Sequence, residues 1–164
     1  MTNRFWGLLV LACMGVGALV WVVVYFNKSA HLELTGAILK VRAQSTDPTN
    51  TMVVADFRIT NTSGRPFVVN AVSVNMDVPD GSTPVESKIL SRSTVDQLFQ
   101  YFGQLRPKYN DVLTLQDRIE PGQTVDRMVA ASFDVPPSVV ESRRTLRVRI
   151  EEFDGVVAEI IENR

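Results

Sequence analysis

The chain contains one histidine and one cysteine, and neither is placed to support catalysis. His31 directly follows an apolar N-terminal segment, and Cys13 lies inside that segment. A Ser-His or Cys-His nucleophile system needs a histidine in the soluble domain, and a zinc site needs several His or Cys ligands. No phosphate loop, Rossmann fingerprint or nucleophile elbow is present either. The sequence therefore predicts a protein that is not an enzyme, with no catalytic residues, no cofactor and no metal.

Acidic residues gather in two places that resemble loop tips. Asp77 and Asp80 form the first group, and Glu151, Glu152 and Asp154 form the second. Either group has the oxygen ligands that calcium prefers, but neither has the spacing of an EF-hand loop. We therefore interpret both groups as turn-forming and solubilising residues, with calcium binding at a loop tip as the alternative.

The basic residues form one cluster, at Arg143, Arg144, Arg147 and Arg149. Arg147 and Arg149 fall on the outward phase of a predicted strand, which favours a solvated face. Contact with anionic lipid headgroups is the alternative. Over the whole chain 17 Lys and Arg stand against 18 Asp and Glu, without the clustered basic excess of a nucleic-acid-binding protein. Nucleic acid is therefore not an expected partner.

A helical pattern interrupts the predicted strands between residues 94 and 105. Its apolar residues recur at helical spacing behind Ser93 and Asp96, a pair that resembles a capping box. The opposite face carries glutamines and Tyr101 and almost no charge, and Arg106 and Tyr109 follow at once. Tyr and Arg are enriched at the energetic centres of interfaces. We predict that Tyr101, Arg106 and Tyr109 form an exposed patch that binds a protein partner or a second copy of this chain.

The N-terminal segment from Phe5 to Phe26 contains 22 residues and no charge. At ~1.5 Å rise per residue a helix of this length reaches ~33 Å, enough to cross a ~30 Å hydrocarbon core. Trp6 lies near one end, and Trp21 and Tyr25 lie near the other, where aromatic rings favour the membrane interface. The segment predicts a transmembrane helix that contacts membrane lipid.

A cleaved signal peptide and a lipoprotein are the two alternatives to an uncleaved anchor. A cleaved signal peptide would need a shorter apolar region and a small-x-small cleavage site, and both are missing. The lipobox-like run ending at Cys13 is followed by further apolar residues rather than by a polar tether. We therefore expect an uncleaved anchor with a cytoplasmic tail of residues 1–4, a membrane span of residues 5–26, a linker of residues 27–31 and an extracytoplasmic β-sandwich of residues 32–164, in the cell membrane.

From residue 32 onward the dominant hydrophobic period is two, the pattern of half-buried strands. In residues 52–60, Val53, Ala55, Phe57 and Ile59 share the inward phase, and Asp56, Arg58 and Thr60 are predicted to face solvent. Phe153-Asp154-Gly155 predicts a hairpin turn, Ile119 to Gly122 predicts a type II turn, and Gly36 predicts a bend. The predicted strands are residues 32–43, 52–60, 67–78, 85–90, 112–115, 125–133, 145–152 and 156–161.

Seven or eight short strands with turns at this spacing predict an antiparallel, immunoglobulin-like β-sandwich with one inserted helix. The run VVADFRITNTSGRPFVVNAVSVNMDVPDG and the later run IEPGQTVDRMVAASFDVPP resemble the telokin-like and late-embryogenesis-type immunoglobulin folds of bacterial membrane-anchored proteins. That family has no set of catalytic residues to carry over. The resemblance implies a binding or assembly module of the cell envelope. An accessory subunit of a membrane enzyme or transporter is the alternative.

Overall fold

The computed structural model describes residues 14–18, 21, 33–79 and 83–162, and the chain divides into two units, residues 1–31 and 32–164. In the first unit, residues 14–18 and 21 are helical, and the side chain of Trp21 is exposed. No helix within the described residues is long and apolar enough to cross a membrane. Most of the predicted span from Phe5 to Phe26 lies outside the described residues, as do Trp6 and Tyr25.

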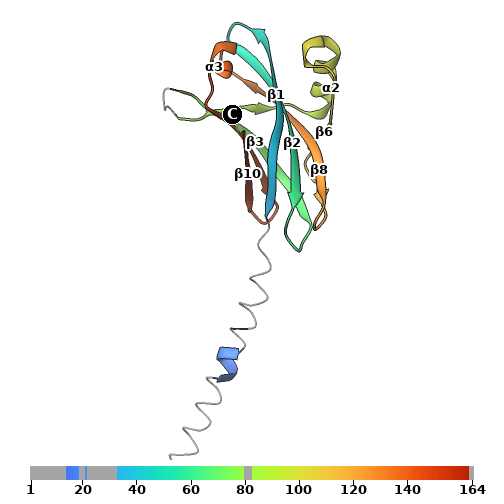
Figure 1. The fold of residues 1–164 in the computed structure, drawn as a ribbon, viewed down its shortest axis with the longest axis vertical. Coiled ribbons are helices and arrows are strands. Elements are labelled where there is room, and N and C mark those ends of the chain that lie inside the picture. Colours follow the sequence, from blue (N-terminus) through green and yellow to red (C-terminus); the bar gives the residue numbers. More distant parts are fainter. Residues whose placement is uncertain (1–13, 19–20, 22–32, 80–82, 163–164) are drawn as a thin grey trace, which may run out of the picture. The chain divides into compact units, whose positions relative to one another are not determined.

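The second unit contains two β-sheets, and the long strands of the first sheet are β1, β2 and β8 (Figure 1). Two short strands, β5 and β6, pair with the free edge of β8, and the β6–β8 pair is parallel. The strands of this sheet are β1 (Leu34–Asp47), β2 (Asn50–Asn61), β8 (Thr124–Phe133), β5 (Lys88–Ile89) and β6 (Asp111–Val112).

The second sheet is antiparallel throughout, in the order β10, β9, β3, β4, with β7 beside β4 on the same edge of β3. Its strands are β10 (Val157–Ile161), β9 (Thr145–Glu152), β3 (Phe67–Asp77), β4 (Val85–Glu86) and β7 (Arg118–Ile119). The order of the long strands in the two sheets is that of an immunoglobulin-type sandwich. The predicted β-sandwich is confirmed, with ten strands in the described residues because four two-residue strands complete the sheet edges.

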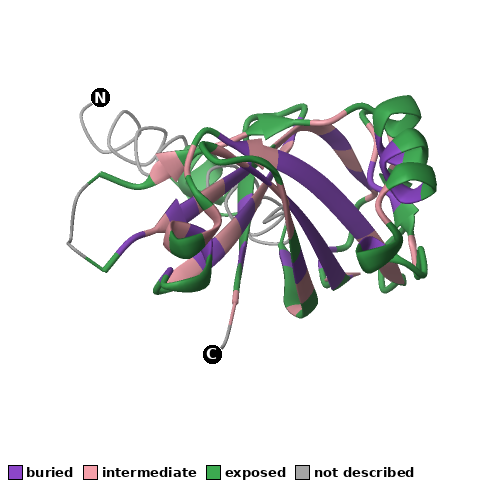
Figure 2. Ribbon diagram, turned by 90° about the horizontal axis from the view of Figure 1, so that it is seen from above, coloured by how far each residue is buried: buried purple, intermediate pink, exposed green. Residues whose placement is uncertain are grey.

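The main core lies between the two sheets, where the period-two pattern places it. The predicted inward set of β2, from Val53 to Ile59, is fully buried and packs against β3 and β9. In β9 the inward residues Leu146, Val148 and Ile150 alternate with half-buried arginines, as predicted. The long buried runs of the central strands appear in purple in Figure 2.

The outer face of the first sheet is not wet along its whole length, which corrects the prediction for β2. Arg58 is exposed as predicted, but Asp56 is only 2% exposed and Val54 is fully buried. The cover is a third layer, formed by the helix α2 (Arg92–Tyr101) and the 3-10 turn η2 (Gly103–Leu105), which Figure 1 shows beside β8. A second apolar cluster fills the space beneath it, made of Val54, Val95, Leu98, Phe99, Leu105, Val112, Met128 and Ala130.

The inserted helix exists, but its ends differ from the predicted ones. Ser91 is the N-cap, and its Oγ accepts a hydrogen bond from the Thr94 backbone N–H at 3.3 Å. The predicted Ser93/Asp96 box is therefore wrong by two residues. A second helix, α3 (Pro137–Glu141), was not predicted. It begins with a proline at its first turn, where the missing N–H costs no hydrogen bond.

Three glycines occupy positions that a larger residue would strain. Gly122 and Gly155 have φ values of 72° and 82°, which confirms the two turns predicted at these positions. At Gly36 a Cβ would lie 2.4 Å from the Arg58 carbonyl oxygen, so the residue permits a close approach of β1 to β2. The register irregularities of β1 lie between Ile38 and Lys40 and between Ser45 and Asp47, rather than at the predicted bend.

Phe57 and Arg58 give a direct test of the phase of β2. Phe57→Ala should lower the free energy of unfolding by about 3–5 kcal/mol, because the ring is fully buried between the sheets. Arg58→Ala removes an exposed ion pair with Asp126 and should leave the free energy of unfolding nearly unchanged, because exposed ion pairs contribute little to stability. The urea midpoint and slope of each variant measure both values. Similar losses for the two variants would contradict the observed phase.

Candidate functional site

One carboxylate of each predicted acidic cluster is bonded within the fold. Asp77 forms an ion pair with Arg147, and the buried Glu152 accepts a hydrogen bond from the Asp154 backbone N–H at 2.6 Å. Among the described residues, no group of three or more His, Cys, Asp or Glu is arranged to hold a metal ion. Asp80 and His31 lie outside the described residues.

The four clustered arginines are also bonded to the protein itself. Arg144 donates to the Pro79 carbonyl oxygen at 2.7 Å, and Arg149 lies 3.1 Å from Glu159. Arg143 is buried and pairs with Glu162, while Arg147 pairs with Asp77. These partners favour a structural role for the cluster over contact with lipid headgroups.

The three residues of the predicted patch are exposed, but their contacts differ. They are Tyr101, Arg106 and Tyr109. Tyr101 is 82% exposed at the end of α2 and makes no hydrogen bond or ring contact with the described residues. Arg106 donates from Nε to the Phe99 carbonyl oxygen at 2.7 Å and from Nη2 to that of Gln100 at 2.8 Å. It therefore satisfies carbonyl groups at the C-terminal end of α2, a position that also favours a positive charge.

Tyr109 faces β1 rather than standing free. It is 54% exposed, and its ring centroid lies 4.9 Å from Lys40 Nζ and 5.1 Å from Arg42 Cζ. Both distances fall within the range of cation–π attraction. The structure thus leaves Tyr101 as the member of the predicted patch that has no structural task among the described residues.

Beneath Tyr109 lies a buried polar cluster centred on Arg42. Its Nη2 lies 2.6 Å from Asp56 Oδ2, and its Nη1 donates to the carbonyl oxygens of Leu105 and Pro107, the latter at 2.8 Å. Asn110 Nδ2 donates to the other oxygen of Asp56 at 3.0 Å. These bonds fasten the segment from η2 to Asn110 onto β1 and β2.

Sequence reasoning missed this cluster because Asp56 occupies the predicted solvent phase of β2. A signal was nevertheless present. Val53 and Val54 are both apolar and lie on opposite faces of the strand, which indicates that both faces are covered there. Nothing local in the sequence shows that Arg42 is the partner.

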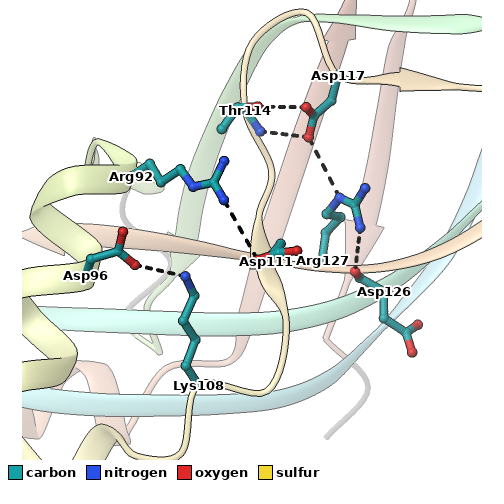
Figure 3. Close-up of polar contacts among 8 residues, drawn as sticks. All are labelled: Arg92, Asp96, Lys108, Asp111, Thr114, Asp117, Asp126 and Arg127. Carbon is teal, nitrogen blue, oxygen red and sulfur yellow. Dashed lines mark hydrogen bonds and ion pairs between the residues drawn. The ribbon is translucent and has the colours of Figure 1, made fainter.

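Exposed polar contacts attach the edges of the third layer, as Figure 3 shows. Lys108 Nζ lies 2.8 Å from Asp96 Oδ1, and Arg92 lies 4.0 Å from Asp111. The hydrogen bond from Lys108 lowers the pKa of the Asp96 carboxyl below its usual value. After β6, Asp117 accepts two hydrogen bonds from Thr114 and lies 3.7 Å from Arg127 of β8.

A groove of about 520 Å³ opens between the edges of the two sheets. One wall is the stretch of β3 between β4 and β7, from Asn70 to Val72. The other is formed by residues 89–92 and 112–115. Its lining is mostly apolar and its volume is within the range of small-molecule sites. Among the described residues, no group of His, Cys, Asp or Glu that could hold a metal ion lies in it.

No protein-family model and no curated protein matches this chain. Three solved structures share part of the fold. A functionally unknown protein from Listeria monocytogenes EGD-e has a TM-score of 0.44 and 10% identity, covering 80% of this chain and 77% of that one. The archaellum periplasmic stator protein complex FlaF and FlaG from Sulfolobus acidocaldarius has a TM-score of 0.35 and 14% identity, covering 77% of this chain and 86% of that one. An uncharacterized β-sandwich protein from Clostridium difficile 630 has a TM-score of 0.34 and 15% identity, covering 81% of this chain and 82% of that one.

At these TM-scores and identities the similar structures carry no argument about function. The assignment of the sandwich rests on its own strand order, and the finer resemblance to the telokin-like and late-embryogenesis-type domains stays a prediction.

Asp56→Ala tests whether the buried ion pair holds the third layer. The variant leaves the Arg42 guanidinium buried without its carboxylate, which should lower the free energy of unfolding by about 3–5 kcal/mol. Asp126→Ala is the matched control, because it removes the partner of an exposed arginine on the same sheet and should leave the free energy of unfolding nearly unchanged. Urea unfolding measures both. A loss at Asp56 no larger than that at Asp126 would contradict the assigned role.

Asp96→Asn should make the attachment of α2 insensitive to acid. Because the folded-state pKa of Asp96 is lowered, its pair with Lys108 stabilises the protein above the unfolded-state pKa of about 3.9. That contribution is lost as the pH falls through the folded-state pKa. The variant should therefore be less stable than the wild type at pH 7, and the difference in urea midpoint should shrink below about pH 4. A difference that stays constant from pH 7 to pH 3 would rule the pair out as its source.

Proposed function

We propose that this protein is a non-enzymatic, protein-binding module of the cell envelope. Residues 5–26 anchor it in the membrane as a single span with the N-terminus in the cytoplasm, and the sandwich lies on the extracytoplasmic side. The uncharged N-terminal segment supports the anchor. The orientation is supported by Arg4, which lies next to the N-terminal end of the segment, because positive charges beside a membrane span favour the cytoplasmic side.

The observation that carries the binding role is the exposed face of α2. Gln97, Gln100 and Tyr101 on α2 and Gln104 in the adjoining η2 are all exposed, and none of them carries a charge. The nearby charges are occupied, since Asp96 pairs with Lys108 and Arg106 caps the helix. Desolvating this face therefore removes few charges from water, and a rigid aromatic ring stands at its edge. Those are properties of the centre of a protein interface.

The third layer also holds this face in one position. α2 is anchored by Val95, Leu98 and Phe99 in the second apolar cluster, and the segment that follows is tied to Arg42. A preorganised surface loses less conformational entropy on binding than a loop does. A partner, or a second copy of this chain, would meet the backbone of α2 at Tyr101 in a nearly fixed position.

Tyr101→Ala tests the binding role in the full-length protein, extracted from its own membranes with mild detergent and chemically crosslinked. If Tyr101 is an interface centre, its loss should cost about 2 kcal/mol, or roughly 30-fold in partner affinity. The urea midpoint should change little, because the side chain is 82% exposed and makes no hydrogen bond or ring contact with the described residues. Leu39→Ala, which removes another exposed apolar side chain on β1, is the control and should crosslink normally.

The same experiment separates the proposal from its alternative. A Tyr101→Ala variant that folds and crosslinks at the wild-type level would refute the α2 face as the binding surface. If that variant still copurifies with one integral membrane protein in fixed proportion, the chain is an accessory subunit whose helix makes the principal contacts.

A further inference from the structure

We infer that the turn between β9 and β10 contacts the lipid surface, with the ring of Phe153 inserted at the headgroup level of the membrane that holds residues 5–26. The inference rests on the proposed membrane anchor. It adds a second attachment that would orient the sandwich relative to the membrane.

The turn does not need an aromatic residue in order to fold. Gly155 takes the positive φ of 82°, and its N–H donates to the Glu152 carbonyl oxygen at 2.9 Å. The Asp154 N–H donates to the Glu152 carboxylate, and the Glu152 N–H donates to the Val156 carbonyl oxygen at 2.8 Å. Backbone groups and one carboxylate therefore make the whole turn. The Phe153 ring takes no part and is 63% exposed.

The turn lies at the end of the sandwich at which β1 begins. Figure 1 shows it beside the start of β1. β1 and β10 also lie close together at Gly36, where an added Cβ would lie 3.2 Å from Ile160 Cδ1 of β10. The β2–β3 turn meets the same end, because Thr62 donates to the Glu33 carbonyl oxygen from both its N–H and its Oγ1, at 3.0 and 3.1 Å.

The length of the intervening chain argues for a lipid partner. Residues 27–33 separate the apolar segment from β1, and even fully extended they keep Leu34 within about 29 Å of Phe26. The entry end is thus tethered to the membrane surface, where an aromatic ring is favoured at the headgroup level. Arg65 is exposed in the β2–β3 turn, and no carboxylate of the described residues pairs with it, which suits a surface of phosphate headgroups. The exposed Asp154 limits the insertion to the depth of the ring.

This contact would point α2 away from the membrane. β1 has 14 residues and spans about 45 Å at ~3.3 Å per residue, and Figure 1 shows α2 toward its far end. With the β9–β10 turn against lipid, Tyr101 would face partners at a distance from the bilayer instead of lying against it.

The test uses the full-length chain with Cys13→Ser, reconstituted in phosphatidylcholine nanodiscs. A single spin label is attached at Asp154→Cys beside Phe153, or at Thr49→Cys in the β1–β2 turn at the opposite end of β1. Collision with a water-soluble nickel complex should be several-fold lower at position 154 than at position 49. Phe153→Ser in the same protein should remove that protection, and its urea midpoint should stay close to that of the Phe153 parent because the residue is 63% exposed and outside the buried core.

Carbonate extraction of the unlabelled protein tests the anchor separately. Loss from the membrane would overturn both the anchor and the lipid contact. Retention with a label at position 154 as accessible to nickel as that at position 49 would overturn the lipid contact alone. Protection that appears only when phosphatidylglycerol is added would overturn ring insertion, because attraction of Arg65 to anionic lipid would then explain it. Protection that persists in Phe153→Ser would do the same.

Discussion

The ion pair between Arg42 and Asp56 is the interaction on which the third layer depends. Both side chains are nearly inaccessible to water, so their attraction must offset the loss of hydration. It does so with help from the carbonyl groups of Leu105 and Pro107 and from the amide of Asn110. These groups come from strands of the first sheet and from the segment after α2. The pair therefore holds two parts of the chain together that are distant in sequence.

The third layer is also required by the sheet beneath it. Val54, Met128 and Ala130 point away from the main core, and without α2 and η2 they would form an apolar patch on the sheet surface. Such a patch favours aggregation or binding in a soluble domain. The helix covers it with Val95, Leu98 and Phe99 and leaves its glutamines and Tyr101 outside. Covering the sheet and displaying the outer face are thus two results of one amphipathic helix.

Local patterns predicted the long strands well, because a period of two and the chemistry of turns are properties of neighbouring residues. β9 and the type II turn at Gly122 are examples. The two-residue strands were not separable in the sequence. The pattern of residues 85–90 predicts one strand. In the structure, Val85–Glu86 pairs in the second sheet and Lys88–Ile89 pairs in the first, with Ser87 between them. The Arg42 cluster was missed for the same reason, since its partners are brought together by tertiary packing. Tyr101 was identified from the sequence, whereas the structural tasks of Arg106 and Tyr109 required the fold.

A pair of apolar residues of similar volume could cover the sheet as well as Arg42 and Asp56 do, and such replacements are often neutral or stabilising. Apolar contact is not directional, however, and would let the segment after α2 slide over the sheet. The guanidinium has donors in fixed directions, and two of its nitrogens are used on Asp56 and on the carbonyls of Leu105 and Pro107. This fixes the backbone just before Tyr109 and just after Tyr101. The charged pair thereby specifies the position of the exposed face, which apolar burial alone would leave undetermined.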